Sequence, residues 1–261
     1  MNSPFAPIPT GLVFALFGLM VGSFLNVCIY RLPRRESIVF PASHCTACGK
    51  EIQWYQNLPV LSWLFLRGRC ANCGEGISII YPFVELLTGG IFLWHYQVFG
   101  ATWLLIPRLM FACGLIVLAF IDLRHRILPN PITLGGTVVG FLISLALPPG
   151  WLASLIGILI GGGVLFLIGE VYLRLRGIEG MGMGDVKMLA MIGAFLGWKA
   201  VLVTLVLSSL SGAIVGAVLL GSQKGNMKYQ LPFGTFLAAS ALIASLYGEA
   251  LIEWYLNLTI A

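Results

Sequence analysis

Charged side chains are absent from residues 127–169, and residues 1–30 also carry none. Across the whole chain, 59% of the residues are hydrophobic and 10% are charged, whereas about 25% of the residues in a soluble domain are charged. A water-soluble fold of this length needs a polar exterior that this composition cannot supply. Because about 20 apolar residues cross a bilayer as a helix, we expect lipid to surround most of the chain.

The apolar runs predict an all-α polytopic membrane protein with about eight transmembrane helices. The turn Pro148-Pro149-Gly150 divides the long uncharged stretch between Arg126 and Glu170 into the fourth and fifth spans. The other predicted spans are residues 10–30, 81–99, 103–121, 188–198, about 200–220 and about 231–251. Seven spans remain an alternative, because the sixth run is short.

The basic residues predict how the chain is oriented. In the eight-span arrangement, 13 of the 15 lysines and arginines fall in four loops on one side: residues 31–80, 122–130, 174–187 and 221–230. Cytosolic loops carry such an excess, so the N-terminus is expected in the periplasm. No basic residue precedes the first run, which argues against a cleavable signal peptide. The basic residues also form no arm or aromatic-interleaved patch, so we expect no nucleic-acid partner.

Glycines four residues apart recur along the predicted spans. Such pairs let membrane helices approach closely, which is a simpler interpretation than a cofactor loop. The pairs are Gly18/Gly22, Gly136/Gly140, Gly157/Gly161 and Gly212/Gly216.

Four cysteines in the polar insert, residues 31–80, predict a metal site. They form two C-x-x-C pairs, each followed at once by a glycine: Cys45, Cys48, Cys70 and Cys73. This spacing is typical of structural zinc, and four sulfurs leave no open position for a catalytic water. Disulfides or free thiols are the alternatives, although a cytosolic loop keeps its thiols reduced. His44 could replace one ligand, but a solvent-exposed histidine is the simpler interpretation.

Asp122 and Asp185 are the only aspartates in the chain. Asp122 ends the third apolar run, and Asp185 begins a later one within Gly180-Met-Gly-Met-Gly-Asp-Val-Lys187. Acidic side chains at membrane depth are expensive and usually functional. Two neighbouring carboxylates share a proton, so one can activate water while the other polarises a peptide carbonyl. Which aspartate takes which part stays open. In the simpler alternative, both aspartates only pair with basic neighbours at the headgroups: Arg124, Arg126 and Lys187.

The residues around Asp185 predict a substrate loop made of Gly182, Gly184 and Lys187. The glycines lack side chains, so a peptide backbone can come close and pair with the loop. No strand precedes this segment and no Walker lysine pattern follows, so a phosphate-binding loop is not favoured.

Together these features resemble the type IV prepilin leader peptidases, a family of bacterial inner-membrane aspartic peptidases that are also N-methyltransferases. The resemblance covers nearly the whole chain. It rests on the two cysteine pairs and on Gly22-Ser-Phe-Leu-Asn-Val-Cys-Ile-Tyr-Arg-Leu-Pro33, Tyr81-Pro-Phe-Val-Glu-Leu-Leu-Thr-Gly89, Ile121-Asp-Leu, Leu128-Pro-Asn130 and Gly182-Met-Gly-Asp-Val-Lys187. Many members carry aspartate where this chain has Asn130.

The resemblance implies cleavage of type IV prepilins or type II secretion pseudopilins after the glycine before their hydrophobic helix. S-adenosylmethionine would then methylate the new N-terminal residue. Asp122 and Asp185 occupy the positions of the catalytic aspartates. The implied domains are a first transmembrane helix (1–30), a zinc-binding insert associated with methyl transfer (31–80) and a peptidase core (81–261). Glu85 is a candidate for holding the substrate amine, although a carboxylate placed for folding is an equal alternative.

Two other classes of protein are alternatives. A membrane scaffold for pilus or secretion assembly would dock its partners through the zinc insert and would not need the aspartates. A transporter fits poorly, because the aspartates lie at span ends rather than at the bilayer centre. The sequence leaves open the oligomeric state and the identity of the pilin substrates.

Overall fold

The computed structural model describes residues 8–177, 182–221 and 231–260, and every regular element in these ranges is helical. The chain divides into two compact units, residues 1–109 and 110–261, and each unit is described by itself. Two parts of the predicted cytosolic loops lie outside the described residues. They are residues 222–230 and residues 178–181, which include Gly180.

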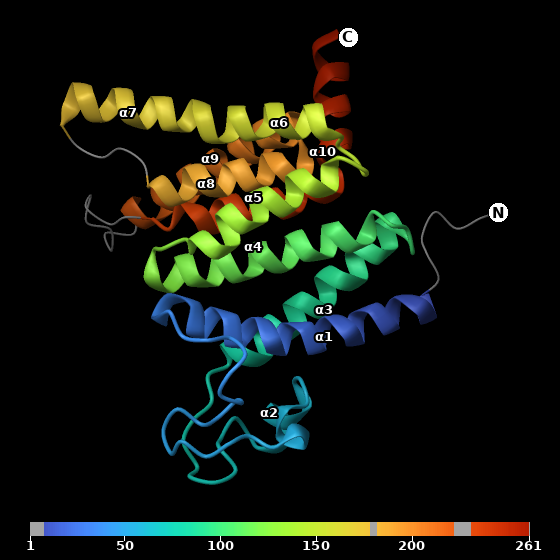
Figure 1. The fold of residues 1–261 in the computed structure, drawn as a ribbon, viewed down its shortest axis with the longest axis vertical. Helices are drawn as coiled ribbons and strands as arrows, with labels where there is room; N and C mark the ends of the chain where they lie inside the picture. The colour runs from blue at the N-terminus through green and yellow to red at the C-terminus, as the bar shows by residue number, and fades with distance from the viewer. Residues whose placement is uncertain (1–7, 178–181, 222–230, 261) are drawn as a thin grey trace. The chain divides into compact units, whose positions relative to one another are not determined.

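The first unit contains two long helices with the insert between them. Its elements are α1 (Ile8–Arg31), η1 (Leu32–Arg34), η2 (Trp54–Asn57), α2 (Leu61–Phe65), α3 (Ile80–Phe99) and the start of α4 (Leu105–His125). Helices α1 and α3 pack side by side (Figure 1). A Cβ added to Gly18 would lie 2.8 Å from Gly89 Cα, and one added to Gly22 would lie 2.7 Å from Glu85 Cα. The predicted close approach at this glycine pair is therefore observed.

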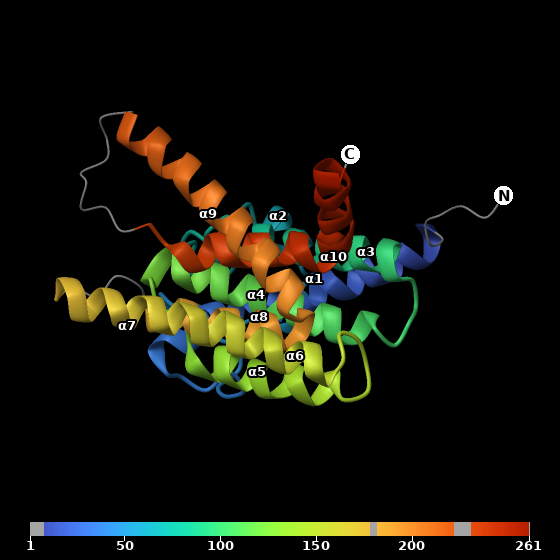
Figure 2. The ribbon, with the colours of Figure 1, turned by 90° about the horizontal axis from the view of Figure 1, so that it is seen from above.

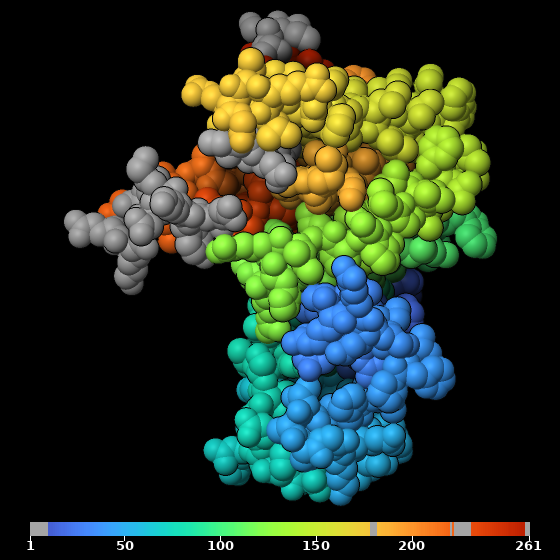
Figure 3. Space-filling model, turned by 60° about the vertical axis from the view of Figure 1, so that its left-hand side comes forward, coloured from blue at the N-terminus to red at the C-terminus, as the bar shows by residue number. Residues whose placement is uncertain are grey.

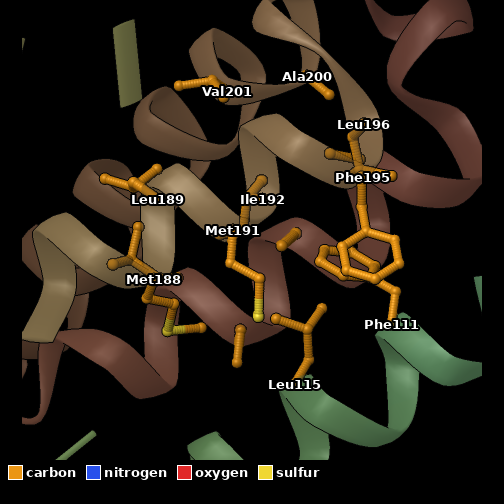
Figure 4. Packing of buried hydrophobic residues seen from close by; sticks show 14 of the residues in the cluster. Phe111, Leu115, Met188, Leu189, Met191, Ile192, Phe195, Leu196, Ala200 and Val201 are labelled. Atoms are coloured by element: carbon orange, nitrogen blue, oxygen red, sulfur yellow. The ribbon is translucent and has the colours of Figure 1, made fainter. Parts of the chain in front are cut away.

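The second unit is built around α8. Besides the rest of α4, it contains α5 (Asn130–Ser144), α6 (Trp151–Ile158), η3 (Leu159–Val164), α7 (Leu165–Arg176), α8 (Met183–Leu196), α9 (Trp198–Gly221) and α10 (Phe233–Ile260). Helices α6 and α7 and the π-helical segment η3 form one continuous rod (Figure 2). Most of α8 is buried, because α5, α6, α9 and α10 pack around it. Figure 4 shows its Met191 and Phe195 facing Phe111 and Leu115 of α4.

Small residues let α6 and η3 approach the backbone of α8. A Cβ on Gly157 would lie 2.6 Å from the Gly193 carbonyl oxygen, and one on Gly161 would lie 2.6 Å from the Leu189 carbonyl oxygen. The Ser154 hydroxyl donates to the Ala194 carbonyl at 2.9 Å. Only glycine leaves enough room for such an approach.

The other two glycine pairs differ from each other. Gly136 and Gly140 of α5 face side chains of α8, and a Cβ at either position would lie within 2.7 Å of Met191 or Phe195. At Gly212 and Gly216 of α9 the nearest atoms would be 4.0 and 3.4 Å away, which is ordinary packing. Close approach is therefore present at three of the four predicted pairs.

The helices agree with a multi-pass membrane protein. Among the described residues, five helices are long and apolar enough to cross a membrane: Thr10–Arg34, Leu105–His125, Trp151–Arg176, Trp198–Leu219 and Phe233–Leu258. Apolar side chains along α9 are exposed, as expected for a lipid-facing surface: Leu202, Val206, Leu210, Ile214 and Val218. The predicted all-α polytopic fold is confirmed. The predicted count of eight spans is not, because α3 and α8 are not among the five and α5 is a shorter apolar helix.

Candidate active site and metal centre

Two matching turns hold the four cysteines of the insert. In the first turn, the Cys45 N–H donates to the Lys50 carbonyl at 2.9 Å and the Gly49 N–H donates to the Cys45 carbonyl at 2.8 Å. The second turn repeats both bonds around Cys70 and Gly74, at 2.7 and 3.0 Å. The two glycines have φ of +71° and +75°, a left-handed conformation that glycine adopts without a steric penalty. The turn geometry thus explains the glycine after each C-x-x-C pair.

The sulfur atoms of these turns lie together. All four Sγ atoms are within 4.8 Å of one another: those of Cys45, Cys48, Cys70 and Cys73. The Cys45 and Cys73 sulfurs are 3.8 Å apart. A tetrahedral ion with Zn–S bonds of about 2.3 Å has sulfur–sulfur edges of about 3.8 Å. The donor set therefore fits a closed four-sulfur zinc site. His44 lies outside this set, and its exposed ring places Nδ1 3.1 Å from the Ala42 carbonyl.

Polar groups around the sulfurs act on their ionisation. The Lys50 backbone N–H and the Asn72 side-chain amide lower the pKa of Cys48 to about 6. The Glu75 backbone N–H acts in the same direction on Cys73, but desolvation and the neighbouring sulfurs outweigh it and raise the pKa of Cys73 to about 12. Four crowded thiols cannot all ionise unless a cation offsets their charge. A zinc ion would supply that charge.

The two halves of the insert contact each other through this centre. The Lys50 ammonium donates to the Asn72 side-chain oxygen at 2.9 Å, and the Asn72 amide nitrogen lies 3.6 Å from the Cys48 sulfur. In Figure 3 the two halves, coloured blue and teal, lie against each other on the surface of the first unit. Outer partners of this kind orient metal ligands.

Glu85 connects α3 to the insert. The residue is 7% exposed, and its Oε2 accepts the Val60 N–H at 2.7 Å. Val60 has φ +62° and ψ −48°, and the Leu61 N–H donates across it to the Pro59 carbonyl at 2.6 Å. This is a γ-turn of the rare positive-φ form, which is strained for a β-branched residue. The buried carboxylate thus supports a turn that the local sequence does not favour.

Two residues of the Gly22–Pro33 motif also hold the first unit together. The Arg31 guanidinium is buried and donates to the carbonyls of Ser37 and Pro41 at 3.0 and 2.8 Å. The Asn26 amide donates to the Tyr81 carbonyl at the start of α3, at 3.0 Å. Satisfying otherwise unpaired carbonyls is a structural role, because it fixes where the insert leaves α1.

Asp122 lies in the last turn of α4 and is 5% exposed. Its Oδ2 accepts two hydrogen bonds from one residue of α10: the Thr235 N–H donates at 2.9 Å and the Thr235 hydroxyl at 3.2 Å. Thr235 stands in the first turn of α10, where backbone N–H groups have no partner four residues earlier in the helix. Its N–H is shared between Asp122 and the Pro232 carbonyl, which is 3.2 Å away. The end of one helix and the start of another therefore meet at this carboxylate.

Asp185 lies in the first turn of α8, and its carboxyl is close enough to Asp122 for the two to interact electrostatically. Leu128 packs between the starts of α8 and α10, beside the two aspartates. A Cβ on Gly184 would lie 3.0 Å from Leu128 Cβ, and one on Gly234 would lie 3.0 Å from Leu128 Cδ1 and 3.0 Å from Asp122 Oδ2. The structure thus places the two predicted aspartates at the same end of the second unit, on either side of Leu128 and within electrostatic range of each other.

The predicted substrate loop lies beside this pair. Gly182 precedes α8 in an extended conformation, and a Cβ there would lie 3.4 Å from Asp185 Oδ2. The Lys187 ammonium donates to the Asn130 side-chain oxygen at 3.0 Å and so joins the starts of α8 and α5. Among the described residues no ion pair joins Lys187 to an aspartate. Arg126, by contrast, acts electrostatically on Asp122. The simpler alternative, in which the aspartates pair with Arg124, Arg126 or Lys187, therefore stays open.

Thr235 is the site residue that sequence reasoning missed. It follows Phe233-Gly234 at the start of an apolar run and carries no charge. The only local signal is a hydroxyl residue near a predicted helix start, which is common. Its bond to Asp122 spans 113 positions and cannot be found from local pattern.

Comparisons with known proteins agree with this arrangement. Residues 16–99 match the bacterial peptidase A24 N-terminal domain, and residues 109–217 match the type IV leader peptidase family. A prepilin leader peptidase/N-methyltransferase of Stutzerimonas stutzeri is 36% identical to this chain. The match covers 96% of this chain and 95% of that protein. A protein of the same name from Aeromonas hydrophila is 39% identical, and the match covers 94% of this chain and 93% of that protein. The chain belongs to the type IV leader peptidase family.

Another relative, from Myxococcus xanthus, is 45% identical over 83% of this chain, but the match spans only 64% of that protein. No solved structure matches the chain. The leader peptidase match contains both Asp122 and Asp185, and the N-terminal match contains the four cysteines and Glu85. Thr235 lies beyond both matches.

Proposed function

We propose that this leader peptidase family member removes the leader peptide of type IV prepilins or type II secretion pseudopilins and then N-methylates the new N-terminal residue. The observation that carries the proposal is that Asp122 and Asp185 lie at the same end of the second unit, within electrostatic range of each other, in a chain of this family. Its relatives are named prepilin leader peptidase/N-methyltransferase, which supports both activities.

In the proposed peptidase reaction the two carboxyls share one proton. The ionised carboxylate takes a proton from water, the water oxygen bonds to the scissile carbonyl carbon, and the protonated partner gives its proton to the carbonyl oxygen. The carbon–nitrogen bond of the resulting diol then breaks. The carboxyl that took a proton from water gives it to the leaving amine. A hydroxyl of the diol gives its proton to the other carboxylate as the carbonyl re-forms. Both carboxyls end in their starting states.

Gly182, Gly184 and Lys187 form the proposed substrate loop. Gly182 supports this role because it is exposed and extended directly before α8, three positions ahead of Asp185. An extended backbone without a side chain can pair with an extended peptide. Lys187 would act through its bond to Asn130, which holds the starts of α5 and α8 together beside the pair.

The insert is proposed to hold structural zinc through Cys45, Cys48, Cys70 and Cys73. S-adenosylmethionine, when bound, would supply an electrophilic methyl group to the new N-terminal amine. Glu85 keeps its candidate role at that amine. Its Oε2 already accepts the Val60 N–H, and the remaining lone pairs of the carboxylate would bind the amine.

We also propose the bacterial inner membrane as the location, with the N-terminus in the periplasm and the aspartate pair facing the cytosol. The distribution of basic residues supports this orientation, because in the predicted eight-span arrangement 13 of the 15 would fall in loops on one side.

The test is mass spectrometry of a purified type IV prepilin after incubation with the detergent-solubilised protein, with and without S-adenosylmethionine. Wild type should remove the leader and, with the methyl donor, add one methyl group. Asp122→Asn and Asp185→Asn should each lower cleavage by a factor of about 10²–10⁴ or more, because acid–base catalysis is lost. Glu170→Gln is the matched control, since Glu170 is paired with Arg174 on α7.

Normal cleavage by both aspartate variants would refute the peptidase assignment. A scaffold function would instead leave the prepilin intact with every variant, while Cys45→Ser would abolish partner binding.

A further inference from the structure

The two aspartates differ in their hydrogen bonds, and this difference bears on which one is the base. Asp122 Oδ2 receives the Thr235 N–H at 2.9 Å and the Thr235 hydroxyl at 3.2 Å. Among the residues that the structure describes, no hydrogen bond reaches the Asp185 carboxylate; the Asp185 N–H donates to the Gly182 carbonyl at 3.1 Å. Within the described part of the chain, donors therefore hold Asp122 and none is seen on Asp185.

The Thr235 hydroxyl has one hydrogen and two acceptors in reach. Its oxygen is 3.2 Å from the Ala119 carbonyl and 3.2 Å from Asp122 Oδ2. Hydrogen bonds to an ionised acceptor are roughly twice as strong as neutral ones. The Ala119 carbonyl also lies inside α4, where the helix already supplies a donor. An ionised Asp122 therefore takes the hydroxyl hydrogen.

Two donors on one oxygen also limit where a proton can sit. With the Thr235 N–H and O–H both directed at Oδ2, a proton there would meet donors instead of acceptors, so Oδ2 is best left unprotonated. Oδ1 remains as the oxygen that can take a proton from water. Three other groups act on Asp122: the Asp185 carboxyl from α8, Arg126 just after α4 and the Gly234 N–H from α10.

We propose that Thr235 is a positioning residue that keeps Asp122 ionised, so that Asp122 is the general base and Asp185 carries the shared proton. This inference rests on the proposed peptidase function. It adds a third residue to the site and assigns the two roles.

The pH dependence of prepilin cleavage tests this assignment. The acidic limb of the profile reports protonation of the base. Thr235→Val keeps the shape of the side chain and removes the hydroxyl donor, so the acidic limb should move to higher pH by about one unit, which is a tenfold change. Thr235→Ser keeps the donor and should leave the limb in place. Thermal unfolding in detergent reports whether each variant is folded.

The outcomes separate the inference from the function beneath it. If wild type does not cleave the prepilin, the peptidase function itself fails. If wild type cleaves and folded Thr235→Val has an unchanged profile, the role of Thr235 is wrong. A shift of the alkaline limb alone would make Asp122 the acid and overturn the assignment. If Thr235→Val does not fold, Thr235→Ala is measured instead. Its acidic limb should lie at higher pH, and that of Thr235→Ser should match wild type.

Discussion

The cysteine centre and the aspartate pair are assembled in opposite ways. Each half of the cysteine centre is a short turn, in which Gly49 or Gly74 closes a bond back to the cysteine four positions earlier. The aspartate site instead needs the end of α4, the starts of α8 and α10, and Leu128 between them. Each half of the cysteine centre is local in the chain, whereas the aspartate site depends throughout on how helices pack.

This contrast indicates which changes each site tolerates. A local turn survives shifts of distant helices and depends on its own four or five residues. A site between helix ends depends on residues that never touch it, because they set the distance between helices. We therefore expect distant substitutions to harm the aspartate site and to leave the cysteine centre intact.

Loss of one sulfur should have the largest effect. Cys70→Ser leaves three thiolates, and zinc content should fall from about one ion per chain to near zero, because structural zinc needs its closed ligand set. Metal analysis after gel filtration measures this. His44→Ala is the matched control and should keep its zinc. Prepilin cleavage by Cys70→Ser should fall much less than its zinc content; an equal fall would contradict the separation between the two sites.

A substitution far from the aspartates should damage their site next most strongly. A Cβ on Gly193 would clash with the Gly157 backbone, so Gly193→Ala should displace α8 or α6 and cost about 1–3 kcal/mol. The melting temperature in thermal unfolding and the rate of prepilin cleavage should both decrease, while the zinc content stays the same. Gly135→Ala is the control, because nothing lies within 4 Å of a Cβ there. Equal stability of the two variants would show that the packing of α8 is looser than described.

Glu85 gives an intermediate case, because a helix residue supports a local turn. Glu85→Ala leaves the Val60 N–H without its acceptor and should cost about 1–2 kcal/mol. Glu85→Gln keeps an acceptor oxygen and should lose less. Hydrogen exchange at the Val60 amide measures the effect directly. Wild-type protection in Glu85→Ala would mean that the γ-turn stands by itself.

The smallest effect is expected at the bond between α5 and α8. Asn130→Asp would turn the hydrogen bond to Lys187 into an ion pair, worth about 0.2–1 kcal/mol for an exposed pair. Thermal unfolding of Asn130→Asp, Lys187→Met and the double variant isolates this term as a double-mutant cycle. A coupling energy of zero would mean that the ion pair is no stronger than the hydrogen bond it replaces.

Much of the fold could be predicted because its signals are local. Uncharged runs predicted helices at the right places, and the insert between residues 31 and 80 lies between α1 and α3 as expected. The span count could not be obtained in this way. Helix α8 is short and buried among other helices, and composition does not distinguish a buried helix from a lipid-facing one.

The sequence by itself determined the chemistry available: four thiols in two turn motifs, and two aspartates at the ends of apolar runs. Only the tertiary structure decided the partners of these groups. It paired Thr235 with Asp122, Lys187 with Asn130 and the Val60 N–H with Glu85 through hydrogen bonds. The physical reason is that a hydrogen bond between distant segments depends on where packing places two atoms, and it leaves no periodicity or spacing in the chain.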